Sequence, residues 1–253
     1  MSISNKLNVI YENTPRVYES GKNEGFEQGK SEGLIEGIEQ GIEQGKQIEY
    51  NEFWDIFQEN GNRTHYSYTF GNGWTTENFK PKYSMQPQYI EAMFRHNDME
   101  VDLVEYLESI GITLDTSNCK QMNYAFYFSN FTRIGEIDCR SLSHSTLTGI
   151  FGECGKLKTI DKLILSDNGT LCSSTFDYCF VLENLTIEGK IGLKSFSLQW
   201  STKLSHDSLL SVLNALLENT TTTTYTLTLG KTNLAKLTDT EKAIATEKGW
   251  TLA

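Results

Sequence analysis

A motif of twenty-five residues recurs in the middle of the chain and constrains the fold more than any other feature. Phe126, Phe151 and Phe176 lie twenty-five residues apart, twice in succession. Three residues after each phenylalanine comes a Cys or a Ser, followed by Leu or Phe and then by Ile or Leu. Recurrence at a fixed period is typical of stacked units that cannot bury their apolar faces alone. We therefore predict a solenoid whose units each form a turn or short helix around Phe-x-x-Cys and a strand around Leu-x-x-Ile.

The motif Phe-x-x-Cys-x-x-Leu-x-x-Ile resembles the BspA-type leucine-rich repeats, a solenoid class of surface proteins. The resemblance covers residues 112–204 and is irregular, because Ser129 replaces the Cys of the first unit and Phe131 replaces its Leu. It implies a short leucine-rich-repeat solenoid. After the repeats, the pattern of apolar residues predicts a helix at 204–216, a strand at 225–230 and a last helix at 237–250. These elements would close the solenoid as a helical cap, as terminal units must.

A second repeat, of four residues, occupies the N-terminal region. We call its seven glycines the glycine ladder: Gly21, Gly25, Gly29, Gly33, Gly37, Gly41 and Gly45. Leu34, Ile38 and Ile42 each follow a glycine of this ladder. Residues four apart nearly superpose on a helix, so the ladder predicts a glycine groove flanked by these aliphatic side chains. Seven glycines cost a helix roughly 7 kcal/mol relative to alanine, and close approach of a neighbouring helix would offset this.

The glycine ladder therefore has two interpretations. The first is a parallel, homo-oligomeric GxxxG stalk, most simply a homotrimeric coiled coil with right-handed crossing, because a four-residue period exceeds 3.6 residues per turn. The second is a flexible acidic linker, which would not need isoleucine to recur after glycine. We favour the stalk, and we expect it to span residues 21–49.

Residues 50–111 are rich in aromatic side chains and form a predicted collar. Residues 65–70 alternate as a strand does, and residues 91–109 carry apolar residues at helical spacing before Gly111. Aromatic clusters of this kind are either a sugar-binding platform or, more commonly, the core of a small domain. The expected fold class is thus α+β, with a glycine-rich helical stalk, a collar, an irregular leucine-rich-repeat solenoid and a helical C-terminal cap.

Charge and composition exclude several classes of partner. The net charge is −11, so nucleic acid, whose phosphates require clustered Lys and Arg, is not an expected partner. No run of eighteen apolar residues occurs, so we expect no membrane insertion. The N-terminus lacks a basic segment followed by an apolar one, so we expect synthesis without a signal peptide.

No motif in the sequence indicates catalysis. The four histidines are scattered, and the five cysteines form no CxxC pair, so we expect no metal site and no cofactor, and interpret the cysteines as buried structural thiols. His206, Asp207 and Ser208 are adjacent, but triad residues must converge from different elements, so this is a helix N-terminus. Acidic residues recur along the solenoid, and a glycosidase-like pair among them is the alternative to a solvated face. They are Glu153, Asp161, Asp177 and Glu183.

The two ends of the chain carry a further resemblance. Residues 13–22 and the C-terminal cap resemble tail-fibre and minor structural proteins of phages and prophages of gut Firmicutes. This implies a virion (phage tail) protein made in the bacterial cytoplasm, with residues 1–20 docking to other tail proteins and residues 112–253 as the head. It also implies host attachment, so we expect a non-enzymatic, receptor-binding protein that recognises a host cell-surface glycan or protein. The receptor-binding candidates are Tyr66, Tyr68, Trp74, Tyr178 and Trp200.

Two other functions remain open from the sequence. One is a bacterial adhesin-like leucine-rich-repeat interaction protein, against which the missing signal peptide counts. The other is a tail enzyme that cleaves glycans, which an assay for sugar release from host cell wall would reveal.

Overall fold

The computed structural model describes residues 58, 63–142, 147–167, 171 and 173–253. The chain divides into two compact units, one of residues 1–62 with 80–82 and one of residues 63–79 with 83–253. In the first unit, the backbone N–H of Lys82 donates to Oε1 of Gln58 at 2.6 Å. The predicted docking segment, all seven ladder glycines, and Leu34, Ile38 and Ile42 lie outside the described residues.

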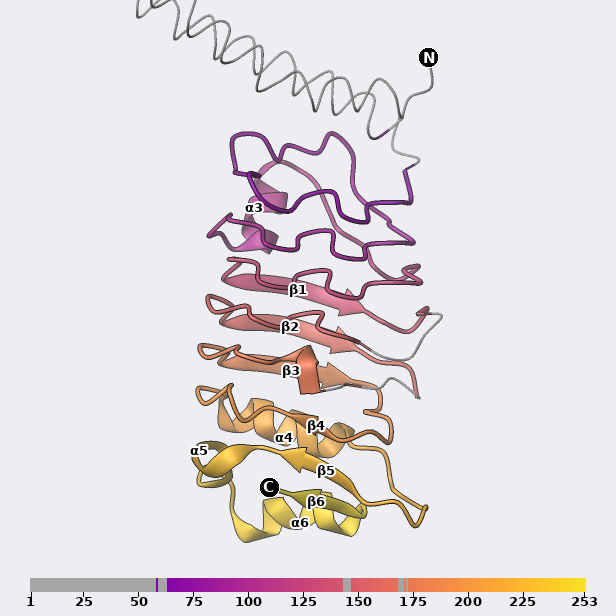
Figure 1. The fold of residues 1–253 in the computed structure, drawn as a ribbon, viewed down its shortest axis with the longest axis vertical. Helices are drawn as coiled ribbons and strands as arrows, with labels where there is room; N and C mark the ends of the chain where they lie inside the picture. The colour runs from indigo at the N-terminus through magenta and orange to yellow at the C-terminus, as the bar shows by residue number, and fades with distance from the viewer. Residues whose placement is uncertain (1–57, 59–62, 143–146, 168–170, 172) are drawn as a thin grey trace, which may run out of the picture. The chain divides into compact units, whose positions relative to one another are not determined.

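The second unit is a stack of chain coils (Figure 1). Its core is a column of five buried phenylalanines, one from each coil. They are Phe70, Phe94, Phe126, Phe151 and Phe176. The rings from Phe94 onward are nearly parallel, with interplanar angles of 16–17° and centroids 5.5–5.8 Å apart. Each ring therefore packs against its equivalent in the neighbouring coil, which explains why a phenylalanine recurs at a fixed spacing.

The repeat begins two coils earlier than the sequence predicts. The N–H of Phe70 donates to the carbonyl of Met93 and that of Phe94 to the carbonyl of Ala125, as the N–H of Phe126 does to Ile150. Phe94 and Phe126 are 32 residues apart, seven more than 25, and helix α3 (Leu103–Ser109), which lies between them, is seven residues long. This insertion obscures the period in the sequence.

Three parallel strands form one side of the stack. They are β1 (Arg133–Asp138), β2 (Thr159–Ile164) and β3 (Asn184–Glu188). Ile134 pairs with Ile160, and Ile160 pairs with Leu185, so equivalent repeat positions are neighbours in the sheet. All three side chains are buried, which confirms the predicted strand positions.

The Phe-x-x-Cys cysteines link neighbouring coils. Cys154 Sγ donates to the carbonyl of Phe126 at 2.9 Å, and Cys179 Sγ donates to the carbonyl of Phe151 at 3.0 Å. Burial raises the pKa of Cys154 to about 11, so its thiol stays protonated. Cys119, Cys139, Cys154 and Cys179 are all free and buried, which confirms the interpretation as structural thiols for these four. Cys172 lies outside the described residues.

The C-terminal part forms a second parallel sheet and three helices. The sheet has the order β4 (Phe196–Ser197), β5 (Tyr225–Thr228), β6 (Trp250–Leu252). Its helices are α4 (His206–Ala215), α5 (Gly230–Leu234) and α6 (Asp239–Glu247), and a 3-10 turn, η2 (Ser173–Thr175), precedes them. The helix predicted at 204–216 is confirmed as α4, and the one predicted at 237–250 is confirmed as α6 except at its end, since α6 stops at Glu247 and Trp250 begins β6. Helix α6 begins with a capping box of Thr238 and Glu241.

Helix α4 covers the open edge of β3 with hydroxyl groups. Ser208 Oγ accepts from the N–H of Leu185 at 2.9 Å, and Ser211 Oγ accepts from the N–H of Ile187 at 2.8 Å. Both hydroxyls also donate back to carbonyls of the β3 segment, those of Glu183 and Ile187. The two serines therefore satisfy strand-edge groups that would otherwise lose hydrogen bonds on burial.

Two predictions for residues 50–111 differ from the structure. The helix predicted at 91–109 exists only from Leu103, because Met93 and Phe94 turn into the core as part of a coil. The strand predicted at 65–70 is reduced to an isolated bridge between His65 and Tyr89. Described residues on both sides of position 111 belong to the same compact unit, and the phenylalanine column runs through both.

Candidate binding surface

Four of the six exposed aromatic residues described in the second unit share an unusual backbone conformation. Six large apolar side chains among the described residues are exposed: Tyr68 (66%), Tyr124 (37%), Phe128 (48%), Tyr178 (40%), Phe180 (48%) and Trp200 (39%). The first four have left-handed backbones, with φ between 56° and 58°. The other two contact Tyr178 through their rings.

These left-handed positions form two columns along one edge of the stack. In the first column Tyr68, Ala92, Tyr124 and Gly149 occupy equivalent positions, and in the second His96, Phe128, Glu153 and Tyr178 do so, all with φ between 51° and 62°. Backbone hydrogen bonds join neighbouring coils here, for example from Phe128 to Gly152 and from Glu153 to Asp177. Because each column repeats one backbone conformation, its side chains leave the edge in the same direction.

The aromatic residues at these positions carry a conformational cost. A residue with a Cβ in the left-handed region is less stable by about 1–2 kcal/mol than in the right-handed one. An exposed ring recovers little of this cost by burial. Glycine would avoid the cost at each site, as Gly149 does in the first column. The exposed rings are therefore not explained by folding stability.

We call the side chains gathered on this edge the aromatic edge. It comprises Tyr68, His96, Tyr124, Tyr127, Phe128, Tyr178, Phe180 and Trp200. At the N-terminal end, the rings of Tyr124 and Tyr127 meet edge to face at 5.6 Å, and Arg95 places its guanidinium 5.8 and 5.5 Å from their centroids. His96 contacts the rings of both Tyr127 and Phe128.

Two glycines make room for the tyrosines of this end. A Cβ on Gly149 would lie 2.5 Å from the ring of Tyr124, and a Cβ on Gly152 would lie 3.2 Å from the ring of Tyr127. Each ring thus leans over a glycine of the next coil. Any side chain at these positions would displace a ring of the aromatic edge.

At the other end, the rings of Tyr178 and Trp200 stack with centroids 5.3 Å apart at an angle of 21°. Phe180 meets Trp200 nearly perpendicularly at 6.1 Å and Tyr178 at 5.7 Å. Tyr178 and Phe180 are two residues apart in one coil, and Trp200 lies twenty residues after Phe180. The result is a second aromatic cluster, separated from the first by the coil that contains Gly152 and Glu153.

The electrostatics of the edge are mainly acidic. A hydrogen bond with Glu91 raises the pKa of Tyr68, and Glu91 also accepts from the amide of Gln121 at 2.8 Å. Burial raises the pKa of Asp177, whose charged form is partly removed from water. Arg95 adds a positive charge to this edge, and its guanidinium faces the rings of Tyr124 and Tyr127.

The five predicted receptor-binding residues differ in how exposed their side chains are. Tyr66 is buried and belongs to the core, which contradicts its role as a contact residue. Trp74 is half-buried and packs edge-on against Phe70 at 5.1 Å, so most of its ring serves the core. Tyr68, Tyr178 and Trp200 are exposed and lie on the aromatic edge. Tyr124, Tyr127 and Phe128 were not among the predicted contact residues, although they lie beside the repeat phenylalanine Phe126 in the sequence.

The recurring acidic residues also differ in their partners and positions. Asp161 accepts two hydrogen bonds at 2.7 Å from Arg133, which also pairs with Asp102. Only Glu153 and Asp177 lie on the aromatic edge. Among the described residues, no group of three or more His, Cys, Asp or Glu side chains is placed to hold a metal ion. Within the same residues, no helix has the length and apolar character that a membrane span requires.

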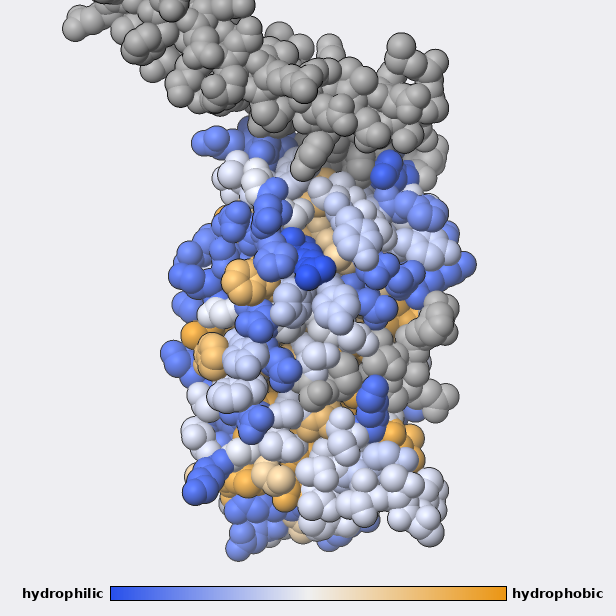
Figure 2. Space-filling model, viewed as in Figure 1, coloured by the Kyte–Doolittle hydropathy of each residue, from blue (hydrophilic) through white to orange (hydrophobic). Residues whose placement is uncertain are grey.

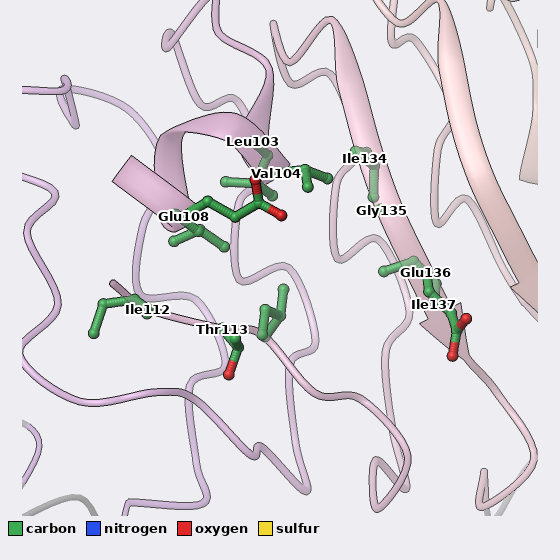
Figure 3. Close-up of a pocket in the computed structure, with 11 residues that line it drawn as sticks. Leu103, Val104, Glu108, Ile112, Thr113, Ile134, Gly135, Glu136 and Ile137 are labelled. Carbon is green, nitrogen blue, oxygen red and sulfur yellow. The ribbon is translucent and has the colours of Figure 1, made fainter. Parts of the chain in front are cut away.

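A cavity of about 190 Å³ lies elsewhere, between α3 and β1 (Figure 3). Its walls are mainly aliphatic side chains of these two elements, and Glu108 extends from α3 across it toward β1. The cavity is smaller than the roughly 300–1,000 Å³ usual for ligand sites. A Cβ on Gly135 would already lie 3.0 Å from Val104, so the two elements pack closely beside it. We interpret the cavity as a packing gap where a helix, instead of a strand, lies beside β1.

Comparison of the chain with models of protein families, with curated proteins and with solved structures gives no match.

Proposed function

We propose that this chain is a non-enzymatic recognition protein of the phage-tail type, in which a leucine-rich-repeat stack binds a host cell-surface glycan or protein through the aromatic edge. The observation that carries the proposal is the set of exposed rings on left-handed backbone. Strained residues that the fold does not need are characteristic of functional sites. Tyrosine and tryptophan are also the side chains that most often dominate binding energy at interfaces.

The tail location and the partners of this proposal rest on the sequence. The resemblance of residues 13–22 and of the C-terminal cap to tail-fibre proteins supports a virion component that docks through residues 1–20. The glycine ladder supports a homotrimeric stalk at 21–49. No catalytic role is proposed, because Asp161 is engaged by Arg133 and no triad or metal-ligand motif is present in the sequence.

Binding of the full chain to whole cells tests the recognition role. A fluorescent conjugate of the protein is expected to label the surface of a host among gut Firmicutes. Tyr178→Ala and Trp200→Ala are each expected to reduce labelling by about tenfold, the loss of a modest interfacial hot spot. Lys231→Ala, an exposed change on α5, is the matched control. Labelling that is unaffected by both aromatic variants would refute recognition through the aromatic edge.

The solution mass tests the stalk. Light scattering should give a trimer for the full chain and a monomer for a chain that begins at Tyr50. A monomeric full chain would reduce the ladder to a tether and favour an adhesin-like interaction module.

A further inference from the structure

The middle of the aromatic edge carries two carboxylates without a described partner. Asp177 is half-buried and Glu153 lies in the left-handed column between Phe128 and Tyr178. Within the described part of the chain, neither side chain makes a hydrogen bond or ion pair. A partly desolvated carboxylate that finds no donor in its own fold lowers stability, and a ligand that supplies a donor would recover that loss.

Glu153 lies in the coil between the two aromatic clusters, and Asp177 lies in the next coil, directly before Tyr178 of the second cluster. Phe128, Glu153 and Tyr178 are equivalent positions of three successive coils, and Tyr127, Gly152 and Asp177 are the preceding positions of the same coils. Coils joined by backbone hydrogen bonds are spaced like neighbouring strands, so the flanking rings are about 10 Å apart along the stack. This distance is comparable with the length of a disaccharide.

Other classes of ligand fit this edge less well. A peptide that binds by strand addition needs free backbone groups, but here the N–H groups of Phe128 and Glu153 already donate to the next coil. An anionic polymer would meet Glu91, Glu153 and Asp177 on a chain of net charge −11. Figure 2 shows one face of the molecule, on which hydrophobic and hydrophilic residues are interspersed.

We propose that the aromatic edge binds a neutral oligosaccharide along the stack, with sugar rings on the two aromatic clusters and with the carboxylates of Glu153, between the clusters, and Asp177, beside the second, accepting hydrogen bonds from sugar hydroxyl groups. This inference rests on the proposed recognition function and narrows its ligand. The apolar C–H faces of pyranose rings pack on Tyr and Trp, which are amphipathic and rigid. Adjacent hydroxyl groups donate to the oxygens of a carboxylate, and such charge-assisted bonds are the strong ones.

Titration of the full chain with defined sugars tests this inference. The neutral probes are the tetrasaccharides of cellulose, chitin, maltose and β-mannan, and the anionic probe is a hyaluronan tetrasaccharide. At least one neutral probe is expected to bind in calorimetry and to change tryptophan fluorescence, since Trp200 lies on the edge. The hyaluronan probe is expected not to bind.

Asp177→Asn and Glu153→Gln distinguish a binding role from a structural one. Each substitution is expected to weaken binding of the neutral sugar by about tenfold, which corresponds to the loss of one charge-assisted hydrogen bond. Asp177→Asn is also expected to raise the melting temperature, because it removes a desolvated charge. Higher stability with weaker binding is a combination that a purely structural residue would not produce. Glu247→Gln on α6 is the matched control and should leave both quantities unchanged.

Three results would overturn the inference: binding of none of the neutral probes, preference for hyaluronan, or unchanged sugar affinity in both carboxylate variants. These outcomes are separable from failure of the proposed function. If cells are labelled through Tyr178 and Trp200 but no neutral probe binds, and protease treatment of the cells abolishes labelling, the ligand is a protein and only the narrower inference fails. If labelling does not depend on these residues, the recognition function itself fails.

Discussion

The phenylalanine column and the aromatic edge use the same class of side chain in the same repeat for opposite purposes. Phe126 is fully buried and stacks on Phe151, whereas Phe128, two residues later, is half exposed and held on left-handed backbone. Burying a large aromatic side chain stabilises a protein by several kcal/mol, but exposing one on strained backbone does not. The difference teaches that stacking of the column stabilises the fold, whereas folding stability does not account for the exposed rings of the edge.

The largest expected effect separates the two regions by stability. Phe151→Ala should lower the free energy of unfolding by about 3–5 kcal/mol, because it leaves a cavity between two stacked rings. Phe128→Ala should lower it by less than about 1 kcal/mol, since the ring is mostly exposed. Chemical denaturation of both variants measures the contrast. Similar losses would show that Phe128 is part of the core after all.

A smaller effect tests the backbone strain of the edge. Tyr178→Gly should be more stable than Tyr178→Ala by about 1 kcal/mol, because glycine adopts the left-handed conformation without steric cost. At Asn214 on α4 the order should reverse, since glycine destabilises a helix relative to alanine. Thermal melting of the Gly and Ala variants at positions 178 and 214 compares the two sites. If Gly and Ala are equivalent at position 178, the edge is not strained.

The smallest effect concerns the acid on the edge. Burial raises the folded-state pKa of Asp177, so the folded protein holds its proton more tightly than the unfolded chain. The free energy of unfolding of the wild type therefore falls as the pH rises from about 3.9, the usual aspartate pKa, through the raised pKa of the folded state. Asp177→Asn should be more stable than wild type at pH 7, and the gain should vanish at a pH below that window.

Asp138 provides the opposite case in the same molecule. Its hydrogen bonds from Arg140 hold the pKa of this nearly buried carboxyl below its usual range. The ion pair stabilises the fold above the unfolded pKa, and that stability is lost as pH falls through the lowered folded pKa. Asp138→Asn should therefore destabilise at pH 7 and converge with wild type in acid. If both variants shift stability in the same direction at pH 7, the contrast between a paired and an unpaired carboxylate is wrong.

Much of the second unit was predictable from local sequence. The 25-residue spacing of Phe126, Phe151 and Phe176 predicted strands in the same positions, and the apolar pattern at 237–250 predicted a last helix that overlaps α6. These predictions succeed because burial of one face at a fixed period is a local property. The first two coils were not predicted, because the seven residues of α3 interrupt the period between Phe94 and Phe126.

The sequence alone determined which residues recur and that the protein is acidic. Only the tertiary structure decided which aromatic residues are core and which are surface. Tyr66 and Tyr68 are two residues apart and identical in chemistry, yet one is buried and the other is the most exposed aromatic residue described. The left-handed turn at Tyr68, hydrogen-bonded through its N–H to Glu91 in the next coil, makes this difference. That turn depends on a neighbouring coil more than twenty residues away, which no local pattern reveals.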